Sequence, residues 1–189
     1  MHNLLNNFHF IDKYNESYLE KIDKNISIIY RNYNKNIKVD TILKIKNHCK
    51  KYKRKFFVAN NYKIALNLNL DGYYIPAFNK DFKHLLSTKK KLIIIGSAHN
   101  LSEINFKIQQ KCQLIFVSPI FKVKKKNNYL GLNVFRRLVI ESNKNVIALG
   151  GINIFNQKKI RISNAKGFAS ISMLKKRPRN ESGPFKYLY

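Results

Sequence analysis

The stretch Asn145-Val146-Ile147-Ala148-Leu149-Gly150-Gly151-Ile152-Asn153 contains the pattern that best indicates the fold of this chain. A short apolar run ends in two glycines, and Asn153 then opens a helical pattern. A second apolar run, Gly167-Phe168-Ala169-Ser170-Ile171-Ser172, follows it. Parallel α/β folds bind ligands at the carboxyl ends of such strands, where glycines let backbone N–H groups approach an anion. We therefore predict that these two segments, one ending in Gly150 and Gly151 and the other in Ser172, form the two sides of a phosphate pocket.

Similar apolar runs recur along the whole chain. Most are continuous rather than alternating, as expected for parallel strands that are covered on both faces. Helical patterns separate them: Asn100-Leu101-Ser102-Glu103 has the spacing of a capping box, and Ile154, Phe155, Ile160 and Ile162 form an apolar stripe. The eight candidate strands are residues 9–11, 26–30, 56–59, 72–75, 92–95, 114–117, 146–149 and 168–171.

This alternation of strands and helices predicts an α/β protein. Eight strands favour a compact TIM (β/α)8 barrel, and a doubly wound open sheet is the alternative. We expect one barrel domain over residues 1–174 and a basic tail over residues 175–189. The last helix is expected to be curtailed, because Pro178 and the Gly183-Pro184 pair cannot sustain it.

The composition predicts a globular protein of the cytoplasm. Hydrophobic residues make up 44% of the 189 residues, which is enough for a sizeable core. No apolar run approaches the roughly 18–20 residues that span a bilayer, and the first residues lack the features of an export signal. Cys49 and Cys112 stand alone, without the spacing of a disulfide framework or a zinc site, so they indicate a reducing compartment.

The formal net charge of +27 raises the question of a nucleic-acid partner. Lysine greatly outnumbers arginine, however, and the charge is spread along the whole chain rather than concentrated in one segment. Lysine, asparagine and isoleucine are also the residues favoured when codons drift toward A and T. Charge-driven RNA binding is therefore a distant alternative, although the field would still attract phosphorylated small molecules.

Five segments in order resemble the thiamine phosphate synthase/TenI family, and the resemblance extends over residues 8–174. The first two are residues 56–66 and Leu70-Asp71-Gly72-Tyr73-Tyr74-Ile75, which are similar to the third and fourth strands of the family. The other three are Ile93-Ile94-Ile95-Gly96-Ser97-Ala98-His99-Asn100-Leu101-Ser102-Glu103, then Val117-Ser118-Pro119-Ile120-Phe121 with Gly131-Leu132, and Ala148-Leu149-Gly150-Gly151-Ile152.

The resemblance implies a (β/α)8 barrel and two alternative reactions. Synthase members of the family join a pyrimidine pyrophosphate to a thiazole phosphate and use Mg²⁺ to help pyrophosphate leave. TenI members act on the thiazole phosphate alone, as tautomerases with a histidine acid/base. Phosphorylated thiazole, and with it pyrimidine pyrophosphate, are the implied ligands of this chain.

The same resemblance implies roles for individual residues. Gly151, Ile171 and Ser172 would hold the thiazole phosphate through backbone amides. Arg31 matches the arginine that ends the second strand, and Lys126 matches the lysine of the sixth loop, although the alignment there is gapped. Ser97 and His99 match the loop of the fifth strand. The implied catalytic residues are thus His99, Arg31 and Lys126, and the implied substrate-binding residues are Ser97 and Asn60.

The chain departs from the family pattern on the metal and pyrophosphate side. Asn60 and Asn79 stand where a synthase has its two magnesium aspartates, and Ile29 and Tyr33 replace a glutamine and a lysine that flank Arg31. Magnesium sites usually contain one or two carboxylates. We therefore predict no metal ligands in this chain, and Mg²⁺ is expected only if synthase activity survives.

Three hypotheses stay open from the sequence. The first is a thiamine phosphate synthase with a degenerate metal and pyrophosphate site. The second is a TenI-like tautomerase that uses His99, which precedes a predicted helix, where a neutral imidazole is favoured over imidazolium. The third is a non-catalytic binder of thiazole or thiamine phosphate. The sequence does not indicate an oligomeric state.

Overall fold

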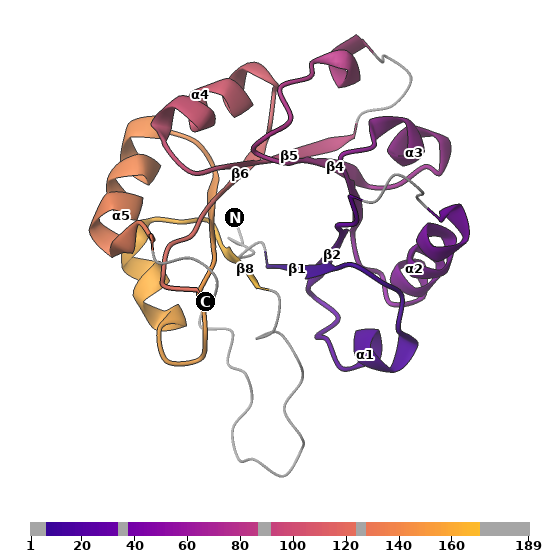
Figure 1. The fold of residues 1–189 in the computed structure, drawn as a ribbon. Helices are drawn as coiled ribbons and strands as arrows, with labels where there is room; N and C mark the ends of the chain where they lie inside the picture. The colour runs from indigo at the N-terminus through magenta and orange to yellow at the C-terminus, as the bar shows by residue number, and fades with distance from the viewer. Residues whose placement is uncertain (1–6, 34–37, 87–91, 124–127, 171–189) are drawn as a thin grey trace.

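The computed structural model describes residues 7–33, 38–86, 92–123 and 128–170. Eight parallel strands alternate with helices along the chain (Figure 1). The strands are β1 (Phe8–Ile11), β2 (Ser27–Tyr30), β3 (Phe56–Ala59), β4 (Gly72–Ile75), β5 (Ile93–Ala98), β6 (Leu114–Val117), β7 (Val146–Leu149) and β8 (Phe168–Ser170). The helices are α1 (Glu16–Glu20), α2 (Val39–Lys51), α3 (Tyr62–Asn67), the 3₁₀ helix η1 (Lys83–Leu86), α4 (Leu101–Gln109), α5 (Gly131–Ser142) and the 3₁₀ helix η2 (Gln157–Ser163).

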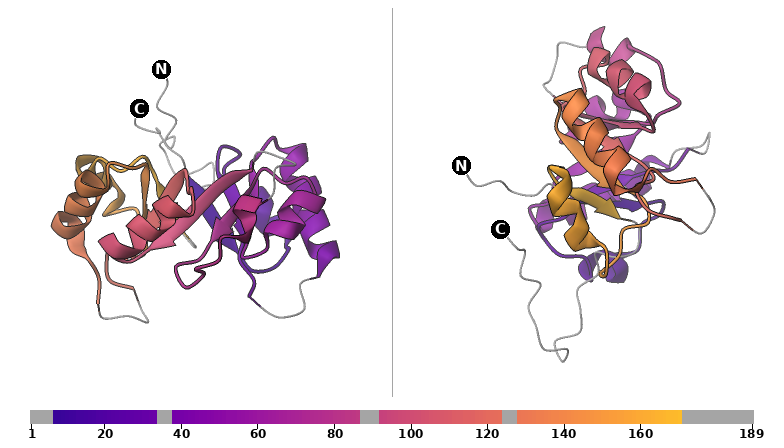
Figure 2. Two further views of the ribbon diagram at one scale, coloured as in Figure 1. Left: turned by 90° about the horizontal axis from the view of Figure 1, so that it is seen from above. Right: turned by 90° about the vertical axis from the view of Figure 1, so that its left-hand side faces the viewer.

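The strands close into a barrel in sequence order. The first strand pairs with the last, with Phe8 opposite Ala169 and His9 opposite Ser170. This pairing confirms the predicted TIM barrel and excludes the open-sheet alternative. The helices form an outer layer around the strands, with α5 and η2 side by side (Figures 1 and 2).

Both faces of the strands are buried, as the continuous apolar runs predict. Along β1, Phe8 and Phe10 point into the barrel, whereas Ile11 packs toward the helices. The ring of Phe10 makes an edge contact with the ring of Phe116 across the barrel, at 5.9 Å between centroids. The interior is filled by Phe8, Phe10, Ile29, Phe57, Ala59, Tyr74, Ile95, Phe116, Ile147, Leu149 and Ala169.

The predicted helical start at Asn153 is confirmed, but the helix that follows β7 is a short 3₁₀ helix. The side-chain oxygen of Asn153 accepts hydrogen bonds from the N–H groups of Phe155 and Asn156, and its carbonyl accepts that of Gln157, as at a helix N-cap. The short 3₁₀ helix η2 follows, and only Ile160 of the expected apolar stripe is buried. Ile154, Phe155 and Ile162 are exposed.

Several sequence predictions concern residues outside the described ranges. They include the curtailed last helix, the basic tail at 175–189 and the end of the domain near residue 174. Within the described residues, no helix is both long and apolar enough to cross a membrane. Cys49 and Cys112 are buried free thiols.

Candidate functional site

The carboxyl ends of the strands bring most of the sequence-predicted site residues to one rim of the barrel. Arg31 directly follows β2, Asn60 follows β3, and the Gly150-Gly151 pair follows β7. Ser97 lies within β5, and His99 directly follows it. In a parallel barrel these strand ends share one face, which is where TIM barrels place their active sites. Lys126, Ile171 and Ser172 lie outside the described residues.

The two glycines after β7 adopt backbone conformations that side chains rarely tolerate. Their φ angles are +93° at Gly150 and +70° at Gly151. A Cβ on Gly150 would lie 2.8 Å from Cβ of Pro119, and one on Gly151 would lie 2.5 Å from the carbonyl oxygen of Phe121. Both positions therefore require glycine, because the loops after β6 and β7 touch there.

Hydrogen bonds fix the glycine turn on both sides. The N–H of Ile120 donates to the carbonyl of Leu149 at 3.0 Å, and the N–H of Phe121 donates to that of Gly150 at 3.1 Å. On the other side, Nδ2 of Asn156 donates to the carbonyl of Gly151 at 2.9 Å. The turn is thus held rigidly at the rim, as a preformed ligand site requires.

His99 is held in place by two neighbouring elements. Its N–H donates to Oε2 of Glu103 at 2.8 Å, and the N–H of Glu103 in turn donates to Oδ1 of Asn100, which caps α4. Its Nδ1 lies 2.6 Å from the carbonyl oxygen of Ser118. Because a carbonyl oxygen only accepts, Nδ1 carries the hydrogen, so a proton that the ring gains or loses must be exchanged at Nε2. The imidazole is oriented as a general base would be.

Arg31 reaches over the top of the barrel core. Its guanidinium lies 4.8 Å from the centroid of the Phe10 ring, at cation–π distance. Below it, burial raises the pKa of the Tyr74 hydroxyl, while a hydrogen bond with Ser97 and the nearby Arg31 charge partly oppose this shift. The Tyr74 hydroxyl thus lies near both Ser97 and Arg31. Sequence reasoning did not single out this proximity, since Tyr74 lies in an apolar strand.

Asn60 and Asn79 meet at the rim through their side chains. Nδ2 of Asn79 donates to Oδ1 of Asn60 at 2.6 Å, and Oδ1 of Asn79 accepts the N–H of Asp81 at 2.7 Å. Both amide oxygens are therefore already used as acceptors within the protein. The sequence placed these two residues at separate loops, and their contact is visible only in the structure.

This donor set does not fit Mg²⁺. The ion prefers carboxylates in octahedral geometry, whereas this pair offers neutral amides whose oxygens face other protein groups. Over the described ranges there is also no cluster of three or more His, Cys, Asp or Glu side chains that could hold a metal ion.

A buried lysine lies behind the rim, on α4. Lys107 has no exposed surface. Burial lowers the pKa of its ammonium to about 8; Lys80 adds to the lowering, and Cys112 and Glu103 oppose it. Sequence reasoning missed Lys107, because a lysine on a helix usually indicates a solvated face.

We expect this lysine to make stability depend on pH in a specific direction. Between about pH 8 and the ordinary lysine pKa of 10.5, the unfolded chain holds a proton at Lys107 that the folded chain has released. The contribution of Lys107 to the free energy of unfolding therefore rises with pH between these two values. Urea unfolding at pH 7 to 10 should show the native chain gaining stability relative to Lys107→Met, in which the other lysines titrate alike. If the free energies of unfolding of the two proteins differed by the same amount at every pH, the burial of a titrating ammonium would be contradicted.

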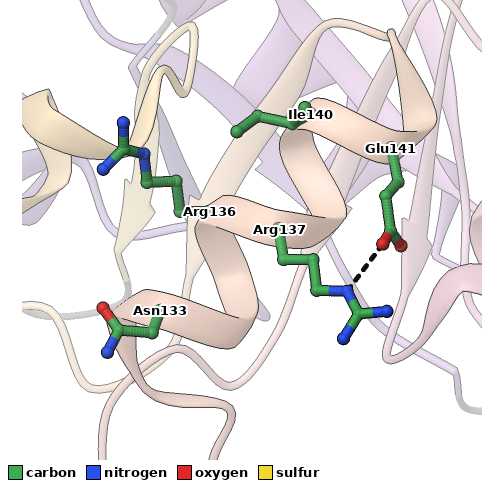
Figure 3. A pocket seen from close by; sticks show the side chains of 5 residues that line it. All are labelled: Asn133, Arg136, Arg137, Ile140 and Glu141. Carbon is green, nitrogen blue, oxygen red and sulfur yellow. Dashed lines mark hydrogen bonds and ion pairs between the residues drawn. The ribbon is translucent and has the colours of Figure 1, made fainter.

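An open surface pocket lies elsewhere, on the outer face of α5 (Figure 3). Arg137 and Glu141 form an ion pair there, with Nε and Oε1 2.6 Å apart. None of the sequence-predicted site residues that the structure describes lines this pocket, which is formed by Asn133, Arg136, Arg137, Ile140 and Glu141.

Comparisons with known proteins identify the family of this chain. Residues 14–174 match the family model of thiamine monophosphate synthase. A thiamine-phosphate synthase of Prochlorococcus marinus strain SARG is 35% identical over 133 residues, which are 67% of this chain and 37% of that protein. Another, from Prochlorococcus marinus subsp. pastoris, is 32% identical over 183 residues, 89% of this chain and 51% of that protein.

Solved structures show the same fold. Thiamine phosphate pyrophosphorylase from Pyrococcus furiosus superposes with a TM-score of 0.71 at 22% identity, over 90% of this chain and 87% of that one. The corresponding protein from Bacteroides thetaiotaomicron gives 0.59 at 15% identity, over 88% and 82%.

The chain spans about half or less of the length of the two Prochlorococcus relatives. The family match nevertheless covers most of this chain, including every strand from β2 to β8. On this evidence the chain belongs to the thiamine phosphate synthase/TenI family.

Proposed function

We propose that this protein acts in thiamine biosynthesis, where it binds a thiazole phosphate and couples it to a pyrimidine pyrophosphate. The observation that carries the proposal is the rigid Gly150-Gly151 turn, which lies on the same rim as Arg31 and His99. Backbone N–H groups at such a turn are suited to hold the thiazole phosphate. The family membership supports the choice of substrates.

Arg31, which directly follows β2 at the rim, is the described cation that we propose for the pyrophosphate. The coupling breaks a carbon–oxygen bond of the pyrimidine substrate, and pyrophosphate leaves with the electron pair while the thiazole nitrogen forms the new bond. The negative charge of the leaving group must be stabilised, and a guanidinium can do so in a partly buried site. Lys126 is the second cation that we propose for this role, from the family resemblance alone. Ser97 and Asn60 are proposed to contact the substrates.

The decisive experiment is calorimetric titration of the full chain with thiazole phosphate and, separately, with pyrimidine pyrophosphate, followed by a coupling assay with both. Binding of both ligands and formation of thiamine phosphate would support the synthase. Binding of thiazole phosphate without turnover on any thiazole substrate would identify a non-catalytic binder. Absence of thiazole phosphate binding would contradict the proposal as a whole.

A second candidate function is isomerisation of the thiazole phosphate, with His99 as the acid/base. The fixed Nδ1 hydrogen bond to Ser118 favours it, because it leaves Nε2 available for proton transfer. We expect His99→Ala to lower the isomerisation rate by about 10²–10⁴-fold, the usual contribution of a general base. An NMR assay of thiazole phosphate isomerisation would measure this loss.

The control for this variant is its affinity for thiazole phosphate. His99 follows β5, whereas the proposed phosphate turn follows β7, so the dissociation constant should stay unchanged. Full isomerisation activity in His99→Ala would reject the tautomerase. We also propose the cytoplasm as the compartment, in keeping with the two buried free thiols.

A further inference from the structure

The Lys107 ammonium makes three hydrogen bonds, all to oxygen atoms. Nζ donates to the carbonyl of Pro76 at 2.8 Å, to the carbonyl of Asn79 at 2.9 Å and to Oε1 of Gln110 at 2.8 Å. An ammonium has three hydrogens, so its donor capacity is filled. Two of the three acceptors belong to the segment that follows β4.

Gln110, which caps α4, holds the same segment. Its Nε2 donates to the carbonyl of Asn79 at 3.2 Å and to that of Asp81 at 2.7 Å. Two side chains from the end of α4 thus bind three carbonyl oxygens of residues 76–81, here named the β4 loop. The backbone carbonyl of Gln110 also lies 2.9 Å from Nε2 of His84, in the 3₁₀ helix that follows this loop.

The β5 strand leaves room for the lysine. A Cβ on Gly96 would lie 2.9 Å from Cδ of Lys107 and 2.7 Å from Sγ of Cys112, so any larger residue would displace the lysine stem. A buried ammonium costs several kcal/mol of desolvation unless its hydrogen bonds are satisfied. Here two of them are satisfied by carbonyls of the β4 loop and the third by Gln110, so the position of the loop and the burial of the lysine depend on each other.

The β4 loop carries two residues that reach across the rim. Asn79 is the partner of Asn60 in the loop after β3, at 2.6 Å. The ring of Phe78 makes an edge contact with the ring of Tyr33 in the segment after β2, at 5.4 Å between centroids. Tyr33 is two residues from Arg31, so this contact places the β4 loop beside the segment that carries Arg31.

We propose that Lys107, together with Gln110, is a positioning residue that fixes the β4 loop over the pyrophosphate half of the site. The lysine acts through the carbonyls of Pro76 and Asn79 and touches no substrate. Without it, Asn79 and Phe78 lose their fixed places opposite Asn60 and Tyr33. The choice of pyrimidine pyrophosphate as the affected ligand rests on the proposed function; the anchoring of the loop does not.

The test compares Lys107→Met with Lys44→Met, which removes an exposed lysine from α2. Methionine keeps the length of the apolar stem but removes all three hydrogen bonds. We expect amide hydrogen exchange of the β4 loop to accelerate about ten-fold or more in Lys107→Met, as expected for the loss of a charged hydrogen bond. By calorimetry, the dissociation constant for pyrimidine pyrophosphate should rise about ten-fold while that for thiazole phosphate changes by less than about two-fold. Lys44→Met should change none of these.

Two results would overturn the proposal. One is native-like exchange of the β4 loop in Lys107→Met, and the other is an equal loss of affinity for both ligands, which would mark a general structural role. Gln110→Leu provides a second variant should Lys107→Met not fold, and it should accelerate exchange in the same loop. If the native chain binds neither ligand, the proposed function is contradicted, and the exchange experiment still decides whether the loop is anchored.

Discussion

Replacing Gly151 with alanine is expected to abolish measurable binding of thiazole phosphate. The added Cβ would lie 2.5 Å from the carbonyl oxygen of Phe121 and 2.6 Å from that of Lys122, at a φ of +70°. A non-glycine residue in such a conformation alone costs about 1–3 kcal/mol, and the two backbone contacts cannot relax by rotation of a side chain. The loops after β6 and β7 must separate, so the turn loses its shape. Calorimetric titration with thiazole phosphate would measure the loss.

Gly131→Ala is the matched control for this variant. Gly131 has nearly the same φ, +73°, but a Cβ there would meet nothing within 4 Å. The two variants therefore share the strain of a positive φ, but only the Cβ of Gly151→Ala collides with the loop after β6. We expect Gly131→Ala to melt at a somewhat lower temperature and to bind thiazole phosphate like the native chain. Equal affinities of the two variants would show that the glycine turn is not the phosphate site.

The second large effect is expected from Asn60→Asp combined with Asn79→Asp. In the native chain these side chains are hydrogen-bonded to each other at 2.6 Å. Two carboxylates at this distance repel each other, and a divalent cation relieves the repulsion. We expect Mg²⁺ to bind at least about ten-fold more tightly to the double variant, since ligand charge governs affinity at such sites. Titration of both proteins with Mg²⁺ alone would measure it.

A control with the same charge change is Asn47→Asp combined with Asn105→Asp, two exposed residues on α2 and α4. This variant should bind Mg²⁺ no better than the native chain, because its carboxylates lie on different helices. A native chain that binds Mg²⁺ as tightly as the Asn60→Asp, Asn79→Asp variant would contradict the conclusion that the amide pair does not fit the ion. So would coupling activity in the native chain that depends strictly on magnesium.

The sequence was sufficient for features that depend on near neighbours. Continuous apolar runs predicted strands that are buried on both faces, and their alternation with helical patterns predicted the closed barrel. The capping box was also predictable, because Asn100 and Glu103 interact within a single turn. Local spacing failed at residues 154–162: Asn153 opens a turn as predicted, but the chain continues as a 3₁₀ helix, and only Ile160 of the expected apolar stripe is buried.

The candidate site was predictable only in part. Strand ends place Arg31, His99 and the glycine pair on one rim, since parallel strands share their direction. That Asn60 binds Asn79, or that the Tyr74 hydroxyl lies near Ser97 and Arg31, follows from no pattern along the chain. These groups belong to different strands and loops, which the closed barrel brings together.

By itself, the sequence determined the buried strands, their alternation with helices and the strand ends at which function is sought, because the periodicity of apolar residues decides which faces must be buried. The closure of the sheet into a barrel and its strand order came from the tertiary structure. Only the tertiary structure decided the environment of individual polar groups. Lys107 shows the difference most clearly: by type it belongs in solvent, yet it has no exposed surface and holds the β4 loop through its hydrogen bonds. The free energy of a buried charge depends on hydrogen-bond acceptors from distant parts of the chain, and these cannot be inferred from the spacing of residues along α4.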